Sequence, residues 1–121
     1  MMENMKLRVE LEVELTQEDI DDIVGTAFYG GISYWCLKAT VVGEYLGEYA
    51  SDQISRGGSV LLKDDDGDHE LNPENFAAAM KRVIAEGRLT IEDGHIDAGE
   101  VDADLADLIV QYAVFGELVY C

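Results

Sequence analysis

Residues 59–87 read SVLLKDDDGDHELNPENFAAAMKRVIAEG, and this stretch decides the fold class. Residues 59–63 predict a short strand, with three apolar residues between a serine and a lysine. Residues 64–68 form an acidic turn with Asp-Gly at its centre, so residues 69–71 are expected to return as a partner strand. The pattern predicts a short β-hairpin.

A helix follows this hairpin directly. Asn72 is a favoured capping residue and Pro73 takes the first helical position, the usual pairing at a helix start. Gly87 ends the helix. Its apolar face is made of Phe76, Met80, Val83 and Ile84. A hairpin followed by an amphipathic helix predicts an α+β domain.

The N-terminal residues 5–15 alternate strictly between apolar and charged side chains, which predicts a strand with one buried and one solvated face. The apolar face is Leu7, Val9, Leu11, Val13 and Leu15, and the charged face is Lys6, Arg8, Glu10, Glu12 and Glu14. We expect this strand to join the sheet of the domain.

Thr16 opens the next predicted helix, with Asp19 in the place of a capping-box acid. Its stripe is Ile20, Ile23, Val24, Ala27 and Phe28. Gly30-Gly31 is expected to end it, because glycine adopts a positive φ without strain. The turn that follows should aim Tyr34 and Trp35 at the core, with Trp35 packed against Phe28 and Ile109.

The rest of the chain has fewer sequence patterns that indicate secondary structure. Residues 32–58 predict a helical turn near 33–38 and an irregular or strand segment through 40–50, and residues 92–99 predict a loop. A last helix starts at Asp102 or Asp104, ends at Gly116, and is followed by a possible terminal strand over 118–120. Its stripe is Val101, Leu105, Leu108, Ile109, Tyr112 and Phe115. We therefore expect one domain over 1–121. It should contain three main helices and one antiparallel or mixed sheet, to which the N-terminal strand and the hairpin belong.

Charge narrows the range of partners. The chain has 26 acidic residues against eight Lys and Arg, a net charge of −18, yet 48% of its residues are apolar, enough to form a core. Such a surface disfavours nucleic acids and anionic membranes and favours basic proteins. The sequence shows no apolar run long enough for a membrane span, no signal-peptide pattern, and two cysteines that fit no disulfide or zinc pattern, so we expect a cytoplasmic protein.

Catalytic and metal-binding motifs find little support. Asp64, Asp66 and Asp68 could attract a hard cation, but His69 and Asn75 stand where an EF-hand needs glycine and glutamate. His69 and His95 have no spacing that fixes them on one face. The sequence has no nucleophile elbow, HExxH, phosphate loop or dinucleotide fingerprint. Acids near the last helix, Asp102, Asp104 and Asp107, are interpreted as complements to the helix dipole. We expect no enzyme, no metal and no cofactor.

Three segments together carry a resemblance. They are residues 16–20 (TQEDI), 26–35 (TAFYGGISYW) and 43–50 (GEYLGEYA), followed by a C-terminal signature in Asp102-Ala103-Asp104, Asp107 and residues 111–117 (QYAVFGE). They resemble a family of small acidic proteins carried by phages and mobile elements, notably of gut bacteria. The resemblance covers most of residues 16–120 and implies no catalytic residue. Small, acidic and phage-borne is also the description of many anti-CRISPR and other counter-defence proteins.

The leading hypothesis is a counter-defence protein of the anti-CRISPR type. It would imitate the charge of a nucleic-acid backbone and occupy the basic surface of a nucleic-acid-binding host defence protein such as a Cas nuclease. The predicted contacts are acids in three stretches: Asp19, Asp21 and Asp22; Asp64, Asp65, Asp66 and Asp68; and Asp97, Glu100, Asp102 and Asp104. The plain alternative is that these acids keep the protein in solution.

A second hypothesis is a sponge that sequesters a signalling nucleotide. Tyr34, Trp35, Tyr45 and Tyr49 would stack on a base, and Arg56 with the following glycines would take a phosphate. The net charge opposes an anionic ligand.

A third hypothesis is a structural role with self-association through the 5–15 strand. Two copies would pair antiparallel, with Lys6 and Arg8 facing glutamates.

Overall fold

The structure, a computed structural model, describes residues 3–121. Within them the chain is an α+β domain with three α-helices, a three-stranded sheet and a two-stranded hairpin. The helices are α1 (Gln17–Thr26), α2 (Pro73–Ala85) and α3 (Ala103–Phe115). The strands are β1 (Lys38–Val41), β2 (Val60–Asp64), β3 (Gly67–Leu71), β4 (Ile91–Glu92) and β5 (His95–Ile96). The predicted fold class and the three main helices are confirmed.

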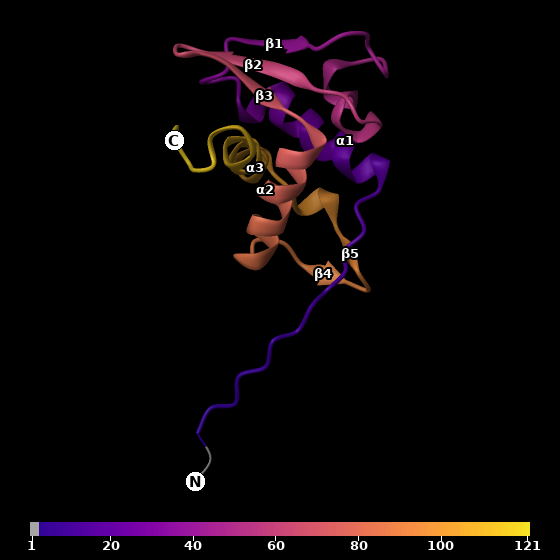
Figure 1. Cartoon of the computed structure of the whole chain (residues 1–121), viewed down its shortest axis with the longest axis vertical. Helices are drawn as coiled ribbons and strands as arrows, with labels where there is room; N and C mark the ends of the chain where they lie inside the picture. The colour runs from indigo at the N-terminus through magenta and orange to yellow at the C-terminus, as the bar shows by residue number, and fades with distance from the viewer. Residues whose placement is uncertain (1–2) are drawn as a thin grey trace.

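The larger sheet is antiparallel, in the order β1-β2-β3, and the helices lie on one side of it (Figure 1). Val60 pairs with Leu71 and Asp64 with Gly67, so the acidic turn closes the β2–β3 hairpin as predicted. β1 adds to the other edge of β2, with Lys38 opposite Lys63. Alternate side chains of β2, Val60 and Leu62, are fully buried and connect the sheet to the helices.

The core lies between the sheet and the helices and is contributed by the three helices, by β2 and β3, and by residues of the connecting segments. α1 contributes Ile23 and Val24, and α2 contributes Phe76, Met80 and Val83, the positions that the stripes predicted. Both helices begin with capping boxes, at Thr16 and Asn72. Trp35 is 5% exposed, so the predicted burial of this ring is confirmed. Among residues 3–121 no helix has the length and apolarity needed to cross a membrane.

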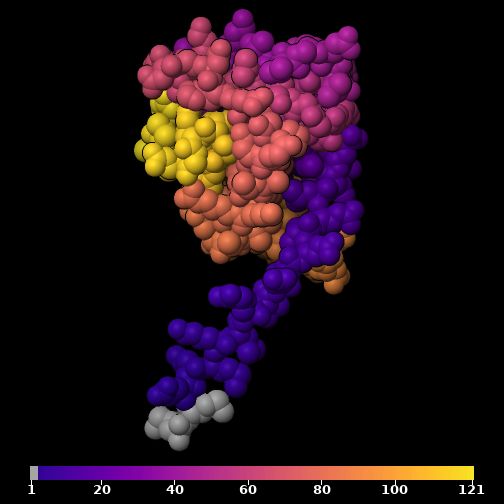
Figure 2. All heavy atoms as spheres, viewed as in Figure 1, coloured from indigo at the N-terminus to yellow at the C-terminus, as the bar shows by residue number. Residues whose placement is uncertain are grey.

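The predicted N-terminal strand does not form. Residues 3–11 run extended away from the body, as Figures 1 and 2 show, and Val13 is the first side chain packed against the core. The first backbone hydrogen bond is at Glu14, whose N–H donates to Gly94 O at 2.8 Å beside His95. Met5, Leu7, Val9 and Leu11 are 69–78% exposed. Alternation predicts that a segment can pair, but it does not supply the partner, and neither edge strand, β1 or β3, takes this segment.

The double glycine also differs from expectation. α1 continues into a π-helical turn, Ala27–Gly31, closed by Ile32 N–H donating to Ala27 O at 2.9 Å. Neither Gly30 nor Gly31 has a positive φ. A Cβ on Gly31 would lie 2.8 Å from Ala103 O, whereas one on Gly30 would meet nothing within 4 Å. Gly31 is therefore needed for its close approach to the start of α3.

Three further segments refine the prediction. The helical turn expected near 33–38 is present as a hydrogen-bonded turn in which Cys36 N–H donates to Ile32 O at 2.8 Å. The irregular or strand segment expected over 40–50 begins in β1 and continues without regular structure to 49, and two 3₁₀ turns that were not expected follow, Ala50–Asp52 and Ile54–Arg56. The predicted loop over 92–99 instead includes the β4–β5 hairpin and a 3₁₀ turn, Ala98–Glu100. Residues 118–120 dock on the body without forming a strand.

Candidate functional site

Two polar residues lie on the buried face of α3, within its apolar stripe. Asp107 is 8% exposed and Gln111, one helical turn later, is fully buried. Polar groups taken out of water need hydrogen-bond partners, so these two side chains determine how the surrounding segments are placed. The earlier interpretation of Asp107 as a helix-dipole complement is wrong, because it lies inside the helix; Asp102 is the residue that caps α3, accepting from Leu105 N–H at 2.8 Å.

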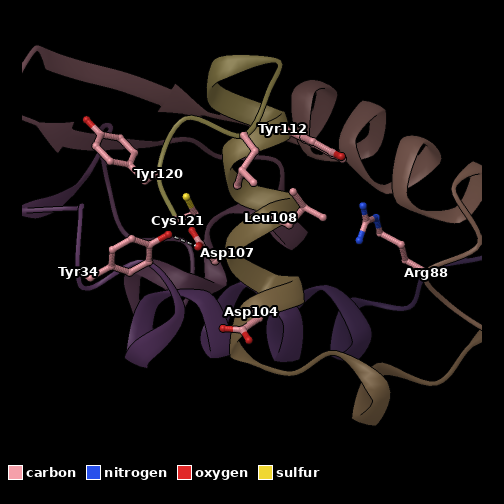
Figure 3. Close-up of a pocket in the computed structure, with 9 residues that line it drawn as sticks. Tyr34, Arg88, Asp104, Asp107, Leu108, Tyr112, Tyr120 and Cys121 are labelled. Carbon is pink, nitrogen blue, oxygen red and sulfur yellow. Dashed lines mark hydrogen bonds between the residues drawn. The ribbon is translucent and has the colours of Figure 1, made fainter.

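Asp107 accepts three hydrogen bonds from side chains. Trp35 Nε1–H donates to Oδ1 at 2.8 Å and Gln111 Nε2–H donates to the same oxygen at 2.9 Å. The Tyr34 hydroxyl donates to Oδ2 at 2.5 Å, the bond drawn in Figure 3. Burial, and then the bond to Asp107, raise the pKa of Tyr34 to about 12. The Gly-Gly-x-x-Tyr-Trp segment is therefore attached to α3 chiefly through the Asp107 carboxylate, and Gln111 Nε2–H also donates to the Tyr34 hydroxyl at 3.3 Å.

Gln111 holds the C-terminal segment. Its Oε1 accepts from Val119 N–H and Tyr120 N–H, both at 2.8 Å, and its Nε2 donates to Tyr120 O at 3.0 Å. The Tyr120 ring stacks on Trp35, with centroids 5.4 Å apart and 3° between planes. Phe115 is tilted against both rings. One amide thus fixes the backbone that brings Tyr120 over the tryptophan.

A second carboxylate secures the other end of Tyr120. The Tyr120 hydroxyl donates to Asp64 Oδ2 at 2.8 Å, and His69 Nε2 lies 2.9 Å from Asp64 Oδ1. Burial of Asp64 tends to raise its pKa, but the bonds from Tyr120, His69 and the Asp66 N–H outweigh burial and the pKa is lowered. The bond to Asp64, with burial, raises the pKa of Tyr120 to about 12. Asp64 is 3% exposed and was predicted as a surface contact; it is instead an internal acceptor.

A hollow of about 560 Å³ opens over this network (Figure 3). Tyr34, Asp107 and Tyr120 line it together with Asp104, Arg88 and Tyr112. Both deep carboxylates are occupied by protein donors, so neither is a free base for proton transfer. The arrangement is that of a structural connection between α3, the aromatic segment and the chain's last residues.

Some of the other predicted acids accept hydrogen bonds from neighbouring groups, and others do not. Asp19 serves the α1 capping box, Asp97 accepts from Gly99 N–H at 2.9 Å and Glu100 from Thr90 Oγ1 at 3.1 Å. Asp21 accepts from Ser55 Oγ at 2.5 Å and from Arg56 at 3.4 Å. The exposed acids without such a bond within residues 3–121 include Asp22 on α1, Asp65, Asp66 and Asp68 at the β2–β3 turn, and Asp104 at the start of α3. The three predicted stretches therefore lie on separate elements.

Arginines of the body are engaged by neighbouring groups. Arg56 lies between Asp21 and Asp52. Arg82 donates to Gly116 O at 2.7 Å and lies 3.7 Å over the Tyr112 ring. Arg88 Nε donates to Glu86 at 2.7 Å, and this contact lowers the pKa of the Glu86 carboxyl. These cations offset acids locally, and the 26 acidic residues of the chain outnumber its eight Lys and Arg, so an excess of carboxylates remains.

The residues of the alternative nucleotide site are not brought together as one site. Tyr34 and Trp35 bind Asp107, and Arg56 is engaged by acids. Tyr45 and Tyr49 lie on the segment 43–49, here called the tyrosine loop, and are 61% and 51% exposed.

Side-chain hydrogen bonds fix the backbone of the tyrosine loop. The fully buried Gln53 accepts from Leu46 N–H at 2.7 Å and donates to Glu44 O at 3.1 Å. Asp52 Oδ2 accepts from Glu48 N–H and Tyr49 N–H. Tyr29, 73% exposed in the π-helical turn that follows α1, lies close enough to Tyr49 to contribute to its raised pKa, after the larger effect of Glu48. The buried Gln53 was not predicted from the sequence, although the repeated Gly-Glu-Tyr of the loop was a signal that this segment is ordered.

Comparison with models of protein families, with curated proteins and with solved structures found no match to this chain. Among residues 3–121, no group of three or more His, Cys, Asp or Glu side chains is arranged to hold a metal ion.

Proposed function

We propose that this protein is a non-catalytic inhibitor, carried by a phage or mobile element, that binds the basic nucleic-acid-binding surface of a host defence protein such as a Cas nuclease. The observation that carries the proposal is the distribution of charge. The chain has a net charge of −18, and the arginines of its body are paired with neighbouring acids or carbonyls. What remains on the surface is an excess of carboxylates, which favours fast association with a basic partner.

The β2–β3 turn is the part of the predicted surface that best suits this role. Asp65, Asp66 and Asp68 are exposed on a tight turn whose base is fixed by Asp64. A rigid turn presents its charges without the entropy cost of ordering a flexible loop. The bond from Asp66 N–H to Asp64 Oδ1, 2.9 Å long, holds the turn in place.

The tyrosine loop supplies contact area beside further acids. Tyrosines are enriched among the residues that dominate binding energy at protein interfaces, since a large ring is ordered at small entropic cost. Tyr45 and Tyr49 are each preceded by a glutamate in sequence, so acidic and aromatic contacts alternate along this loop. This combination fits a basic surface better than an apolar one.

The test starts with expression of the full chain in a bacterial host and mass-spectrometric identification of the protein that co-purifies. Affinity for that partner is then measured with two variants of equal charge change. Asp65→Asn/Asp66→Asn alters the proposed surface, and Glu74→Gln/Glu117→Gln alters exposed acids elsewhere.

We expect the turn variant to bind about 2- to 5-fold more weakly per neutralised carboxylate, from about 0.5–1 kcal/mol each. The control variant should change affinity little, and raising salt from about 50 to about 400 mM should weaken both complexes. A partner without a nucleic-acid-binding surface, or affinity unaffected by salt, would contradict the proposal.

A further inference from the structure

The N-terminal arm, residues 3–13, has the chemistry of a strand and lacks a strand partner in this chain. One face carries Met5, Leu7, Val9 and Leu11, each at least 69% exposed. The other face carries two basic residues followed by acids. An extended segment with unpaired backbone groups and an exposed apolar face is a template for pairing with another chain.

We propose that two copies of this protein associate through their N-terminal arms, which pair antiparallel about a two-fold axis at Val9. Closed two-fold symmetry is the commonest arrangement of homo-oligomers, and it places the same segment on both sides of the interface. The partner that each arm pairs with is therefore the arm of a second copy. This inference does not depend on the proposed function.

The charged face selects the register. With Val9 opposite Val9, Lys6 faces Glu12 and Arg8 faces Glu10 of the second copy, and the symmetry repeats both pairs. Cross-strand pairs of opposite charge stabilise a ribbon, and like charges directly opposite destabilise it. Moving the axis to residue 10 would place Glu10 opposite itself, and a parallel arrangement would place Lys6 opposite Lys6.

The same register also matches the apolar face. Leu7 faces Leu11 of the second copy, and Met5 faces its Val13. Residues Leu11 and Val13, with Val9 and Leu15, line a groove of about 430 Å³ against α2, whose wall includes Met80 and Ile84. Each arm thus carries Met5 and Leu7 to the groove of the other copy. Contact with α2 of both copies covers the apolar face of the ribbon. A two-stranded ribbon is only marginally stable in water without such packing.

Sedimentation equilibrium of the full chain tests association, and charge-reversed arms test its cause. Lys6→Glu/Arg8→Glu makes the charged face of the arm wholly acidic, and Glu10→Lys/Glu12→Lys makes it wholly basic. We expect the unaltered chain to be a dimer, each variant alone to be at least 10-fold weaker in association, and an equimolar mixture of the two to form heterodimers. Lys38→Glu/Lys63→Glu has the same net charge as the acidic arm variant and should remain dimeric, because both lysines lie in the sheet.

Cysteine cross-linking tests the register, in a background with Cys36→Ser and Cys121→Ser. Opposite residues of antiparallel strands have Cα atoms about 4.5–5.5 Å apart, within disulfide range, so Val9→Cys should cross-link under oxidised glutathione. Leu7→Cys should not, since four residues of strand, about 13 Å, separate the two copies of residue 7.

The proposal is overturned if the unaltered chain is a monomer at every concentration, because the arm then has no second copy. It is also overturned if dimers persist in both arm variants, if the mixture fails to associate, or if Leu7→Cys cross-links as readily as Val9→Cys.

Discussion

Replacing Trp35 by alanine and by phenylalanine separates the two ways in which this residue holds the domain together. The indole ring is 5% exposed, stacks on Tyr120 and contacts Phe115, while its Nε1–H donates to Asp107 at 2.8 Å. Alanine removes both the ring and the donor. Phenylalanine keeps an aromatic ring in the same place and removes the donor.

The magnitudes follow from these contacts. Truncating a buried tryptophan to alanine costs about 3–5 kcal/mol, a large part of a small domain's stability of about 5–15 kcal/mol. A hydrogen bond to a charged group contributes about 1.5–3 kcal/mol. Since Asp107 keeps its bonds from Tyr34 and Gln111, we expect Trp35→Phe to cost about 2 kcal/mol.

Urea unfolding followed by far-ultraviolet circular dichroism measures both variants, because the fluorescence of the single tryptophan is lost with the residue. A double-mutant cycle with Asp107→Ala isolates the pair, because alanine offers the indole N–H no acceptor, and the coupling energy should be about 1–2 kcal/mol. If Trp35→Ala unfolded at the same urea concentration as the unaltered protein, the assignment of Trp35 to the core would be wrong. If the coupling energy were below about 0.3 kcal/mol, the bond to Asp107 would not be what attaches this segment to α3.

Three further predictions use other parts of the same structure. Gly31→Ala should lower the free energy of unfolding by about 1–3 kcal/mol, because its Cβ would meet Ala103 O at 2.8 Å. Gly30→Ala, with open space around the Cβ, should change it by less than about 0.5 kcal/mol. Thermal unfolding compares the two variants, and equal effects would contradict the close approach of Gly31 to α3. Gln53→Ala should speed hydrogen exchange at Leu46 more than at Val83, since only the first amide loses its acceptor, and unchanged exchange would mean that other contacts hold the tyrosine loop. The pKa of Tyr34 and of Tyr120 is raised from 10.0 to about 12 on folding, so their stabilisation is complete below pH 10 and is lost as the pH rises toward 12. A Tyr34→Phe/Tyr120→Phe variant should therefore be less stable at pH 8 but flatter over pH 10–12 in urea unfolding, and parallel pH profiles would refute this cause.

Local signals in the sequence were sufficient for the elements that they describe. Thr16 and Asn72 begin helices because each cap satisfies backbone groups within its own first turn. The 64–68 turn formed as predicted because its geometry needs no distant partner. The apolar faces of α1 and α2 became core for the same reason, since the 3.6-residue period is a property of one segment.

The remaining features depend on contacts between distant segments, which spacing does not encode. The arm at residues 3–13 has strand chemistry, but the partner that it needs is not in the sheet. Asp107 and Gln111 are polar residues one turn apart inside an apolar stripe, and this was the available signal that α3 carries an internal connection. Their partners, Trp35 and the 119–120 backbone, could not be identified before the helix was placed beside them. For the same reason Asp64 was expected on the surface, since nothing local indicates that Tyr120 reaches it.

The hydrogen bonds between Gln111 and the Tyr120 backbone have a consequence for synthesis of the protein. While the ribosome is still making α3, the nascent chain already contains Trp35, yet the ring that covers this indole has not been made. Tyr120 lies 85 residues after Trp35 in the sequence, so the indole stays in contact with water until that later segment has left the exit tunnel. Native packing around Trp35 must therefore follow synthesis of the segment that carries Tyr120, and until then the uncovered indole is exposed to non-native contacts.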